Sequence, residues 1–402
     1  MIMTAARPSL RVLVGVQDEG FNGIETYAEQ IAAAGAAAGH DVTLLVTSEK
    51  VAKVVAARVD ASIRIRHLGL EAPGRVAKIA GRLWDGVAMR RLVRAVRRGL
   101  ADETERYDIA HLNRPVLASA VRAVADRVVV GAWFYPHAPL TRVVHTWEHN
   151  RGPLLRRLVL AGKSLSYYRG DAAGFAAADR VAAPTTLLAQ QLQRQGVPAE
   201  WCPPPVQVVS ASATPPAERE AGVVRLVSVS GDLTHPRKNL QDTLAAAARL
   251  ARPGRRVVVE MIGRNPEALR ASAGRMPAGV EVVFPGPLER TAVHRRVATA
   301  DALVLPSLYE EWGYVAVEAL LLGTPVVTYP VYPFASMLEG GLGVVATGTR
   351  AEDLAQAIER VLDGACVSNL ADAAAARYGA DAIGRRLSTM WSETRNTACP
   401  PS

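Results

Sequence analysis

Short apolar segments alternate with segments of helical periodicity along this 402-residue chain. Leu10–Val16 has the composition of a buried strand, and a polar loop containing glycine separates it from a helical pattern that runs from Ile24 to Ala38. A second strand is expected at Val42–Val46. A strand, a helix and another strand in this order form the repeating unit of a doubly wound parallel sheet, so an α/β fold is expected. The same alternation predicts further strands at Asp108–His111, Val128–Val130 and Arg180–Ala183.

A second series of strands and helices begins at Val223, after a stretch rich in proline and small polar residues. Pro203–Pro205 and Ser210–Glu220 have the composition of a linker. Strands are expected at Val223–Val229, Val257–Ile262, Val280–Phe284, Ala302–Leu305 and Pro325–Thr328. Helices are expected at Leu240–Leu250, Thr291–Ala300, Tyr314–Leu322, Ala351–Leu362 and Ala382–Arg395.

The two series predict two domains of similar size, each with its own core. We expect an N-terminal Rossmann-like domain over residues 1–205, a linker over 206–222 and a C-terminal domain over 223–381. A helix over 382–396 is expected to cross back to the first domain, and 397–402 to form a tail. Folds of this kind bind ligands beyond the carboxyl ends of their strands, so a cleft between the domains is the expected binding site.

The composition excludes disordered chains, membrane-spanning proteins and disulfide-rich domains. Charged residues make up 21% of the chain and hydrophobic residues 49%. The longest apolar stretches, such as Ala316–Val327, are interrupted and shorter than a membrane span. The first residues lack the layout of a signal peptide, so a cytoplasmic location is expected. Cys202, Cys366 and Cys399 are far apart, which argues against a disulfide framework and against a zinc site.

Positive charge is concentrated in the first half of the chain. Residues 1–205 contain 27 Lys and Arg against 18 Asp and Glu, whereas residues 206–402 contain 20 of each kind. Within Arg75–Arg98, one face of a helical pattern is apolar and the opposite face carries five arginines. The apolar face consists of Leu92, Val93, Val96 and Leu100. A basic amphipathic helix can lie on an anionic membrane, but so short an apolar face can be buried against the N-domain, so we favour a solvated helix over peripheral membrane contact. No recognition motif accompanies the charge, so nucleic acid is not expected as a partner.

The segment Glu310–Glu318 (EEWGYVAVE) combines a glycine at a helix start with a carboxylate on each side of it. It follows the strand that ends at Leu305. The first N–H groups of a helix lie at the positive end of its dipole and form an anion site, which a diphosphate fits. The two carboxylates can accept hydrogen bonds from sugar hydroxyls on either side of such a diphosphate. The motif therefore predicts a site for a nucleoside diphosphate sugar, although a capped helix with solvated glutamates would show the same spacing.

The context of this segment resembles the donor site of glycosyltransferase family 4, a group of retaining enzymes with the GT-B fold. Residues 306–327 fit the pattern P-S-x-x-E-x-x-G-x-x-x-x-E-A-x-x-x-G-T-P-V-V. Upstream, Gly231 and the pair Arg237-Lys238 resemble the family's strand-end glycine and phosphate-binding lysine. Gly263, Phe284–Leu288 and the N-terminal loop Asn22–Tyr27 also lie at the family's usual places. The resemblance covers most of residues 9–390, is dense over 225–330 and is thin over 50–200.

The resemblance implies a GT-B fold of two facing Rossmann-like domains with an interdomain cleft, and transfer of a hexose-type sugar from a UDP or GDP donor to an acceptor hydroxyl, with retention. Lys238 would stabilise the leaving diphosphate, Glu310 would contact the donor sugar and Glu318 the ribose. The other implied donor contacts are Gly231, Arg237, Gly263, Pro287, Leu288, Gly313, Tyr314 and Val315. Asn22 and Gly23 would approach the phosphates or the acceptor. No D-x-D pair occurs, so neither a metal nor a cofactor is expected, and the sugar nucleotide is itself a substrate.

The acceptor side departs from the family pattern. His137 is our candidate catalytic residue there, and a packing role would explain it equally well. The basic first half indicates an anionic lipid or phosphorylated acceptor in cell-envelope synthesis, whereas Asp18-Glu19 indicates a cationic small molecule such as an aminocyclitol in antibiotic synthesis. Asp232 stands near the place where the family often has an arginine, and Arg237 can supply that charge. Two other functions stay open: a non-catalytic nucleotide-sugar-binding homologue and a GT-B nucleotide-sugar epimerase. An NAD enzyme is disfavoured, because no G-x-G-x-x-G follows the first strand.

Overall fold

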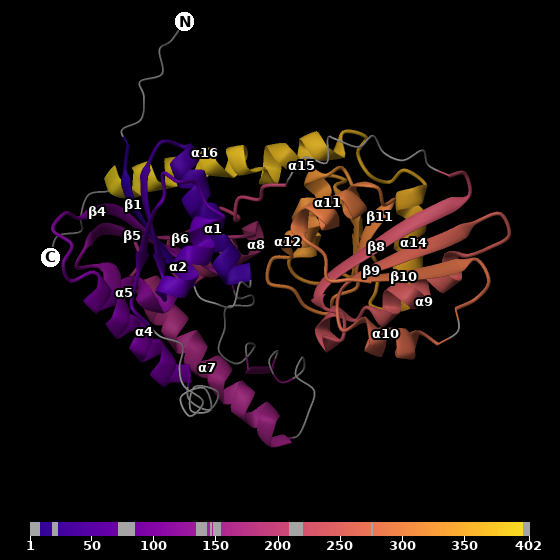
Figure 1. Ribbon diagram of the computed structural model, residues 1–402, viewed down its shortest axis with the longest axis horizontal. Helices are drawn as coiled ribbons and strands as arrows, with labels where there is room; N and C mark the ends of the chain where they lie inside the picture. The colour runs from indigo at the N-terminus through magenta and orange to yellow at the C-terminus, as the bar shows by residue number, and fades with distance from the viewer. Residues whose placement is uncertain are drawn as a thin grey trace, which may run out of the picture. The chain divides into compact units, whose positions relative to one another are not determined.

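A computed structural model describes residues 9–17, 23–70, 85–133, 143–144, 147, 154–208, 220–274 and 276–396. The chain forms two compact units (Figure 1). Unit 1 comprises residues 1–205 together with 380–402, and unit 2 comprises residues 206–379. The last helix therefore belongs to the N-terminal unit. The boundary differs slightly from the expected one, because the helix begins at Ala380 rather than at residue 382, and Val206 forms a bridge with Gly379 inside unit 2.

Unit 1 contains a seven-stranded parallel sheet with the order β3-β2-β1-β4-β5-β6-β7. Its strands are β1 (Arg11–Gln17), β2 (Asp41–Val46), β3 (Arg64–His67), β4 (Tyr107–Leu112), β5 (Ala125–Gly131), β6 (Arg180–Ala183) and β7 (Ala199–Trp201). Its described helices are α1 (Gly23–Ala37), α2 (Glu49–Ala56), α4 (Asp85–Gly99), η1 (Pro115–Leu117), α5 (Ala118–Val121), α7 (Leu154–Ala176), α8 (Thr186–Arg194) and α16 (Ala380–Asn396). Strands β1 to β3 are added towards one edge of the sheet and strands β4 to β7 towards the other, so the strand order reverses between β1 and β4, as in a doubly wound Rossmann fold.

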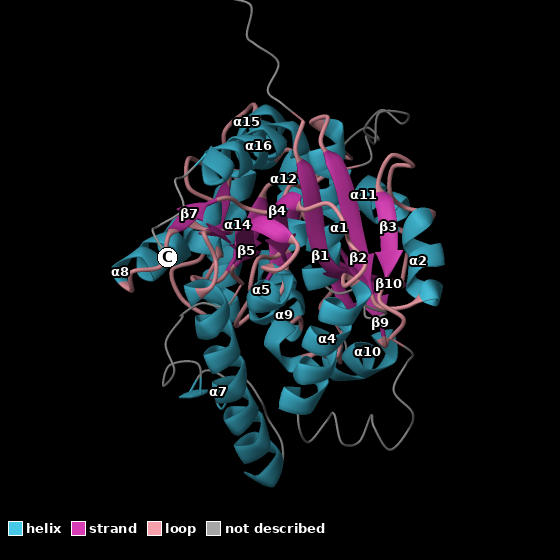
Figure 2. Ribbon diagram, turned by 90° about the vertical axis from the view of Figure 1, so that its left-hand side faces the viewer, coloured by secondary structure: helices cyan, strands magenta, loops and turns pink. Residues whose placement is uncertain are grey.

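Both faces of this sheet are buried, because its strands are apolar at successive positions. Val12 and Val14 of β1 belong to one core cluster and Leu13 to the other, since neighbouring side chains of a strand point to opposite faces. One cluster includes α1 and α16, and the other includes α4 and α5. Figure 2 shows helices on both sides of the sheet. The return of α16 to unit 1 thus covers a sheet face that α1 alone leaves open.

Helix α4 is amphipathic, as its sequence predicts. Val96 and Leu100 are buried in the core of unit 1, and Leu92 and Val93 pack against it. Arginines cover the opposite, exposed face, at positions 90, 91, 94, 97 and 98. The apolar face of α4 is therefore occupied by contacts within the unit. In the described part of the chain, no helix combines the length and the apolar character needed to cross a bilayer.

Unit 2 contains a six-stranded parallel sheet with the order β10-β9-β8-β11-β12-β13. Its strands are β8 (Val223–Asp232), β9 (Arg256–Arg264), β10 (Val280–Gly286), β11 (Ala302–Leu305), β12 (Val326–Thr328) and β13 (Gly343–Val345). Its helices are η2 (Pro236–Lys238), α9 (Gln241–Leu250), α10 (Pro266–Ala273), α11 (Arg290–Ala298), α12 (Tyr314–Leu321), α13 (Phe334–Met337), α14 (Ala351–Leu362) and α15 (Leu370–Tyr378). This is again the Rossmann strand order, in which the order of strands reverses between β8 and β11.

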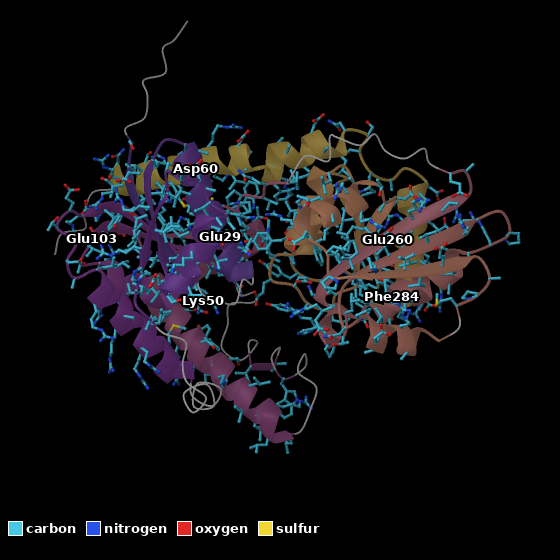
Figure 3. All side chains as sticks on the ribbon, viewed as in Figure 1. Glu29, Lys50, Asp60, Glu103, Glu260 and Phe284 are labelled. Carbon is cyan, nitrogen blue, oxygen red and sulfur yellow. The ribbon has the colours of Figure 1, made fainter. Side chains whose placement is uncertain are left out.

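Side chains of β9 and β10 contact two helices of unit 2. Figure 3 labels Glu260 on β9 and Phe284 on β10. Glu260 accepts a hydrogen bond from Arg296 of α11 over 3.0 Å. The guanidinium of Arg270, on α10, lies 5.0 Å from the centroid of the Phe284 ring. These contacts link α11 to β9 and α10 to β10.

Candidate functional site

The predicted donor residues of unit 2 gather where its two central strands end. Gly231 is the second-last residue of β8, and the loop after this strand carries Arg237 and Lys238 in η2. The loop after β11 carries Glu310 and leads into α12. β8 and β11 are neighbours at the point where the strand order reverses, which is where doubly wound sheets usually bind their ligands.

Lys238 and Glu310 form an ion pair across these two loops. The Lys238 ammonium donates to Oε1 of Glu310, and the Ser307 hydroxyl donates to the same oxygen over 2.9 Å. The Glu310 side chain is 8% exposed and that of Lys238 is 19% exposed. Removing either partner would leave a largely buried charge uncompensated, so the two side chains hold each other in place.

A backbone contact fixes the same two loops. The N–H of Leu308 donates to the carbonyl of Arg237 over 2.8 Å. The Arg237 guanidinium lies 5.9 Å from the centroid of the Tyr309 ring, and its buried Nε has no hydrogen-bond partner among the described residues. Two cationic side chains thus stand side by side at the carboxyl edge of the sheet.

Helix α12 presents an open N-terminus to this edge. Its N-cap is Gly313, which has φ of 81° and no side chain to cap the first N–H groups. A Cβ at this position would lie 3.0 Å from the Phe334 ring, so both the backbone conformation and the space favour glycine. Tyr314 and Val315 form the first turn. The free N–H groups of this turn are suited to an anion.

Glu318 lies one turn further along α12. Its Oε1 accepts a hydrogen bond from Arg290 over 2.8 Å, and Nε2 of His294 lies 3.7 Å from it. Arg290 also donates to the carbonyl of Gln207 over 2.7 Å. The hydroxyl of Tyr314 is buried without a hydrogen-bond partner in the described chain, and burial together with the charge of Glu318 raises the pKa of that phenol. Glu318 is therefore oriented by Arg290 of α11, and the His294 ring of the same helix lies beside it.

Gly263 allows β8 and β9 to approach each other at this edge. A Cβ on Gly263 would lie 2.1 Å from the carbonyl oxygen of Ser230. This distance is too short for any side chain, so only glycine fits at this position. Pro287 and Leu288 follow β10 and precede α11, whose N-cap is Glu289. The C-terminal residues expected from the sequence thus all lie at one edge of one sheet.

Asp232, which stands near the place where the resemblance would put an arginine, forms hydrogen bonds within its own turn. Its Oδ1 accepts from the N–H of Thr234 over 2.9 Å and from the Thr234 hydroxyl over 2.7 Å. These hydrogen bonds hold the pKa of the Asp232 carboxyl below its usual range. Asp232 therefore remains anionic and shapes the loop that leads to Lys238.

The acceptor-side predictions are only partly visible. Asn22 and His137 lie outside the described residues, and Gly23 is the first residue of α1. Three residues of unit 2 were missed by the sequence analysis: Ser307, Arg290 and His294. Ser307 stood inside the quoted pattern, but neither basic residue lies at a spacing from Glu318 that indicates contact. Within the described residues, no group of three His, Cys, Asp or Glu side chains could hold a metal ion.

Two family models match the chain. The model "Glycosyl transferase 4-like domain" matches residues 22–203, and "Glycosyl transferases group 1" matches residues 223–378. Among similar proteins, the alpha-D-kanosaminyltransferase of Streptomyces kanamyceticus is 29% identical over 164 residues, which are 39% of this chain and 42% of that protein. The 2-deoxystreptamine glucosyltransferase of the same organism is 31% identical over 156 residues, 36% of this chain and 38% of that protein. The chain thus spans about two fifths of the length of these relatives.

Solved structures show the same fold at low sequence identity. Sucrose-phosphate synthase from Thermosynechococcus elongatus has a TM-score of 0.65 at 18% identity, covering 96% of this chain and 99% of that one. Anabaena HepE, solved in complex with UDP-glucose, has a TM-score of 0.60 at 16% identity, covering 95% and 99%. The strand orders and these structures show the GT-B fold, and the two family models, which together match residues 22–203 and 223–378, show that the chain is a glycosyltransferase. Its N-terminal half is of the glycosyl transferase 4-like type and its C-terminal half is of the group 1 type.

Proposed function

We propose that this protein is a family 4 glycosyltransferase that transfers a hexose-type sugar, with retention and without a metal ion, from a nucleoside diphosphate sugar to an acceptor hydroxyl. The observation that carries the proposal is the Lys238–Glu310 pair beside the open N-terminus of α12. A half-buried ammonium and the first N–H groups of α12 can stabilise the negative charge that develops on a leaving diphosphate. No protein nucleophile is needed if a leaving phosphate oxygen takes the acceptor proton.

In this proposal, Glu318 and Glu310 bind different parts of the donor. Glu318, held by Arg290, accepts hydrogen bonds from the ribose hydroxyls. Glu310 contacts the donor sugar, and Lys238 exchanges part of its contact with Glu310 for the diphosphate. The segment at Pro287 and Leu288 faces the base. The donor nucleotide is UDP or GDP.

For the acceptor we propose a small polyhydroxylated ring, such as an aminocyclitol. The relatives include a 2-deoxystreptamine glucosyltransferase and a D-inositol 3-phosphate glycosyltransferase from Catenulispora acidiphila, the latter 33% identical over 161 residues. Both names contain a six-membered carbocyclic polyol. The alternative, a lipid acceptor of the cell envelope, is separated from this one by the acceptor assay below.

The test combines binding with turnover. Thermal shift with UDP, GDP and dTDP sugars identifies the donor, because a ligand that binds only the folded state raises Tm. Turnover with that donor is then followed by NMR with cyclitol and lipid acceptors, which reports the anomeric configuration of the product. A donor that binds but is never consumed would favour the non-catalytic alternative. Conversion of the donor's sugar without an acceptor would favour the epimerase. Formation of the inverted anomer would contradict retention.

A further inference from the structure

A chain of hydrogen bonds leads from the end of β12 to the residue that follows Lys238. Tyr329 comes directly after β12, and its side chain is fully buried. Its hydroxyl donates to Oδ2 of Asp242 over 2.6 Å. The same oxygen accepts a hydrogen bond from Nδ2 of Asn239, also over 2.6 Å. Asp242, in the first turn of α9, thus joins a tyrosine from one strand end to an asparagine in the loop after another.

Asn239 sets the direction of the backbone at Lys238. It has φ of 51° and ψ of 36°, in the left-handed region that residues other than glycine seldom adopt. Its N–H donates to the carbonyl of Pro236 over 3.2 Å and ends the η2 turn. Its side chain has partners at both ends, since Gln241 donates to Oδ1 over 2.7 Å. This unfavourable conformation persists because the surrounding contacts impose it.

The η2 turn is therefore supported from two sides. The loop after β11 holds it through Leu308, whose N–H donates to Arg237, and through the Lys238–Glu310 pair. The other support is the path Tyr329–Asp242–Asn239. A ligand that takes over the Lys238 ammonium weakens the contact with Glu310. The second support does not involve the ammonium, so it is unaffected by that exchange.

We propose that Tyr329 is a positioning residue for the donor diphosphate: through Asp242 and Asn239, it fixes the turn that presents Lys238. Burial and the neighbouring Asp242 carboxylate raise the pKa of Tyr329, so the phenol keeps its proton and remains a donor. The quoted donor-site pattern ends at Val327, so it does not include Tyr329. The inference rests on the proposed function, since it assigns Lys238 to the diphosphate.

Tyr329→Phe tests this inference, because it removes the hydroxyl and keeps the buried ring. A small displacement of the Lys238 ammonium should lower the reaction rate strongly. We therefore expect kcat/KM for the donor to fall about ten-fold and the Kd for UDP or GDP to rise by a similar factor. Two matched variants control for the loss of a buried phenol. Tyr378→Phe, in the same unit, removes a hydrogen bond to the carbonyl of Met337, and Tyr107→Phe, in unit 1, removes one to the carboxylate of Glu103. All three variants should lower Tm, but the two controls should change kcat/KM less than two-fold, roughly the scatter of distant sites.

The decisive measurement is a double-mutant cycle with Lys238→Ala. If Tyr329 acts through Lys238, Tyr329→Phe should have no further effect on nucleotide Kd once the ammonium is absent. Asn239→Gly keeps the left-handed backbone and removes the side-chain link, so it should reproduce the loss seen for Tyr329→Phe. Independent, multiplying losses for Tyr329→Phe and Lys238→Ala would overturn the inference, as would a Tyr329→Phe variant that behaves like Tyr378→Phe. If Lys238→Ala itself leaves nucleotide binding unchanged, the assignment of the donor site fails instead.

Discussion

The indole N–H of Trp391 donates a hydrogen bond to Nδ1 of His111 over 2.9 Å, which ties the last helix of the chain to the middle of the N-terminal sheet. The other ring nitrogen, Nε2, lies 2.6 Å from the Tyr27 hydroxyl. Nδ1 must accept from the indole, so the neutral ring carries its proton on Nε2. His40 makes a parallel contact, since its Nε2 lies 3.0 Å from the Ser388 hydroxyl of the same helix. Two histidines thus fasten α16 to unit 1 in their neutral form.

The attachment of α16 should therefore weaken in acid. Burial lowers the pKa of His111 from 6.5 to about 3. A lowered folded-state pKa means that the unfolded chain binds the proton more readily, so stability is complete above about pH 6.5 and is lost as the pH falls towards about 3. We expect this group to contribute a slope of about 1.4 kcal/mol per pH unit to the free energy of unfolding in that window.

Chemical denaturation between pH 7 and pH 4 measures that slope. His111→Phe keeps an aromatic ring but cannot be protonated, so its stability should depend less steeply on pH than that of the wild type. His67→Gln, at an exposed histidine of β3, should keep the wild-type slope. Equal slopes for wild type and His111→Phe would show that His111 is not responsible for the acid sensitivity.

Lys238→Ala should lower kcat/KM strongly, and Glu318→Ala should weaken nucleotide binding. A hydrogen bond to a charged group contributes about 1.5–3 kcal/mol, which corresponds to a roughly ten- to hundred-fold loss for each variant. Steady-state kinetics and titration calorimetry with the nucleotide separate the two effects. Glu352→Ala, at a surface glutamate of α14 that pairs with Arg350, is the matched control for Glu318. Full activity of both site variants would place the donor elsewhere.

Much of the donor site could be predicted because it depends on local order along the chain. Lys238 and Glu310 each follow a central strand, and a parallel sheet brings the loops after neighbouring strands to one edge. The contact of Arg290 with Glu318 could not be predicted in this way. It depends on how α11 packs against α12, and that packing has no signature in the spacing of the two residues.

The fold shows the same division between local and distant determinants. Every strand that the apolar pattern predicted is present, whereas the short strands β3, β7 and β13 were missed. Arg64–His67 alternates charged and apolar residues over only four positions, and β7 and β13 have three residues each. The burial of His111 could not be foreseen either, since its partners Tyr27 and Trp391 are 84 and 280 residues away in sequence.

Turnover should not require a divalent metal. The proposed chemistry relies on Lys238 and the N-terminus of α12 for the charge of the leaving diphosphate, so a metal would duplicate their role. The measurement is the initial rate after treatment with EDTA, compared with the rate after magnesium or manganese is restored. We expect the two rates to agree within about two-fold, which is a difference of roughly 0.4 kcal/mol in the barrier. A complete loss that either metal reverses would contradict metal-independent transfer.

The arginine face of α4 should not bind the protein tightly to a membrane. Val96 and Leu100 are buried in unit 1, so this helix has no apolar face left to insert between lipids. Its exposed arginines would attract anionic lipid only over about a Debye length, roughly 8 Å at physiological salt. In co-sedimentation with anionic vesicles at that salt, we expect little bound protein, and the same small fraction for a variant with Arg90, Arg91 and Arg94 changed to Glu. A variant with Arg249, Arg295 and Arg360 of unit 2 changed to Glu carries the same change in net charge and is the matched control. Strong binding that only the α4 substitutions abolish would overturn this prediction and would favour a lipid acceptor over a soluble cyclitol.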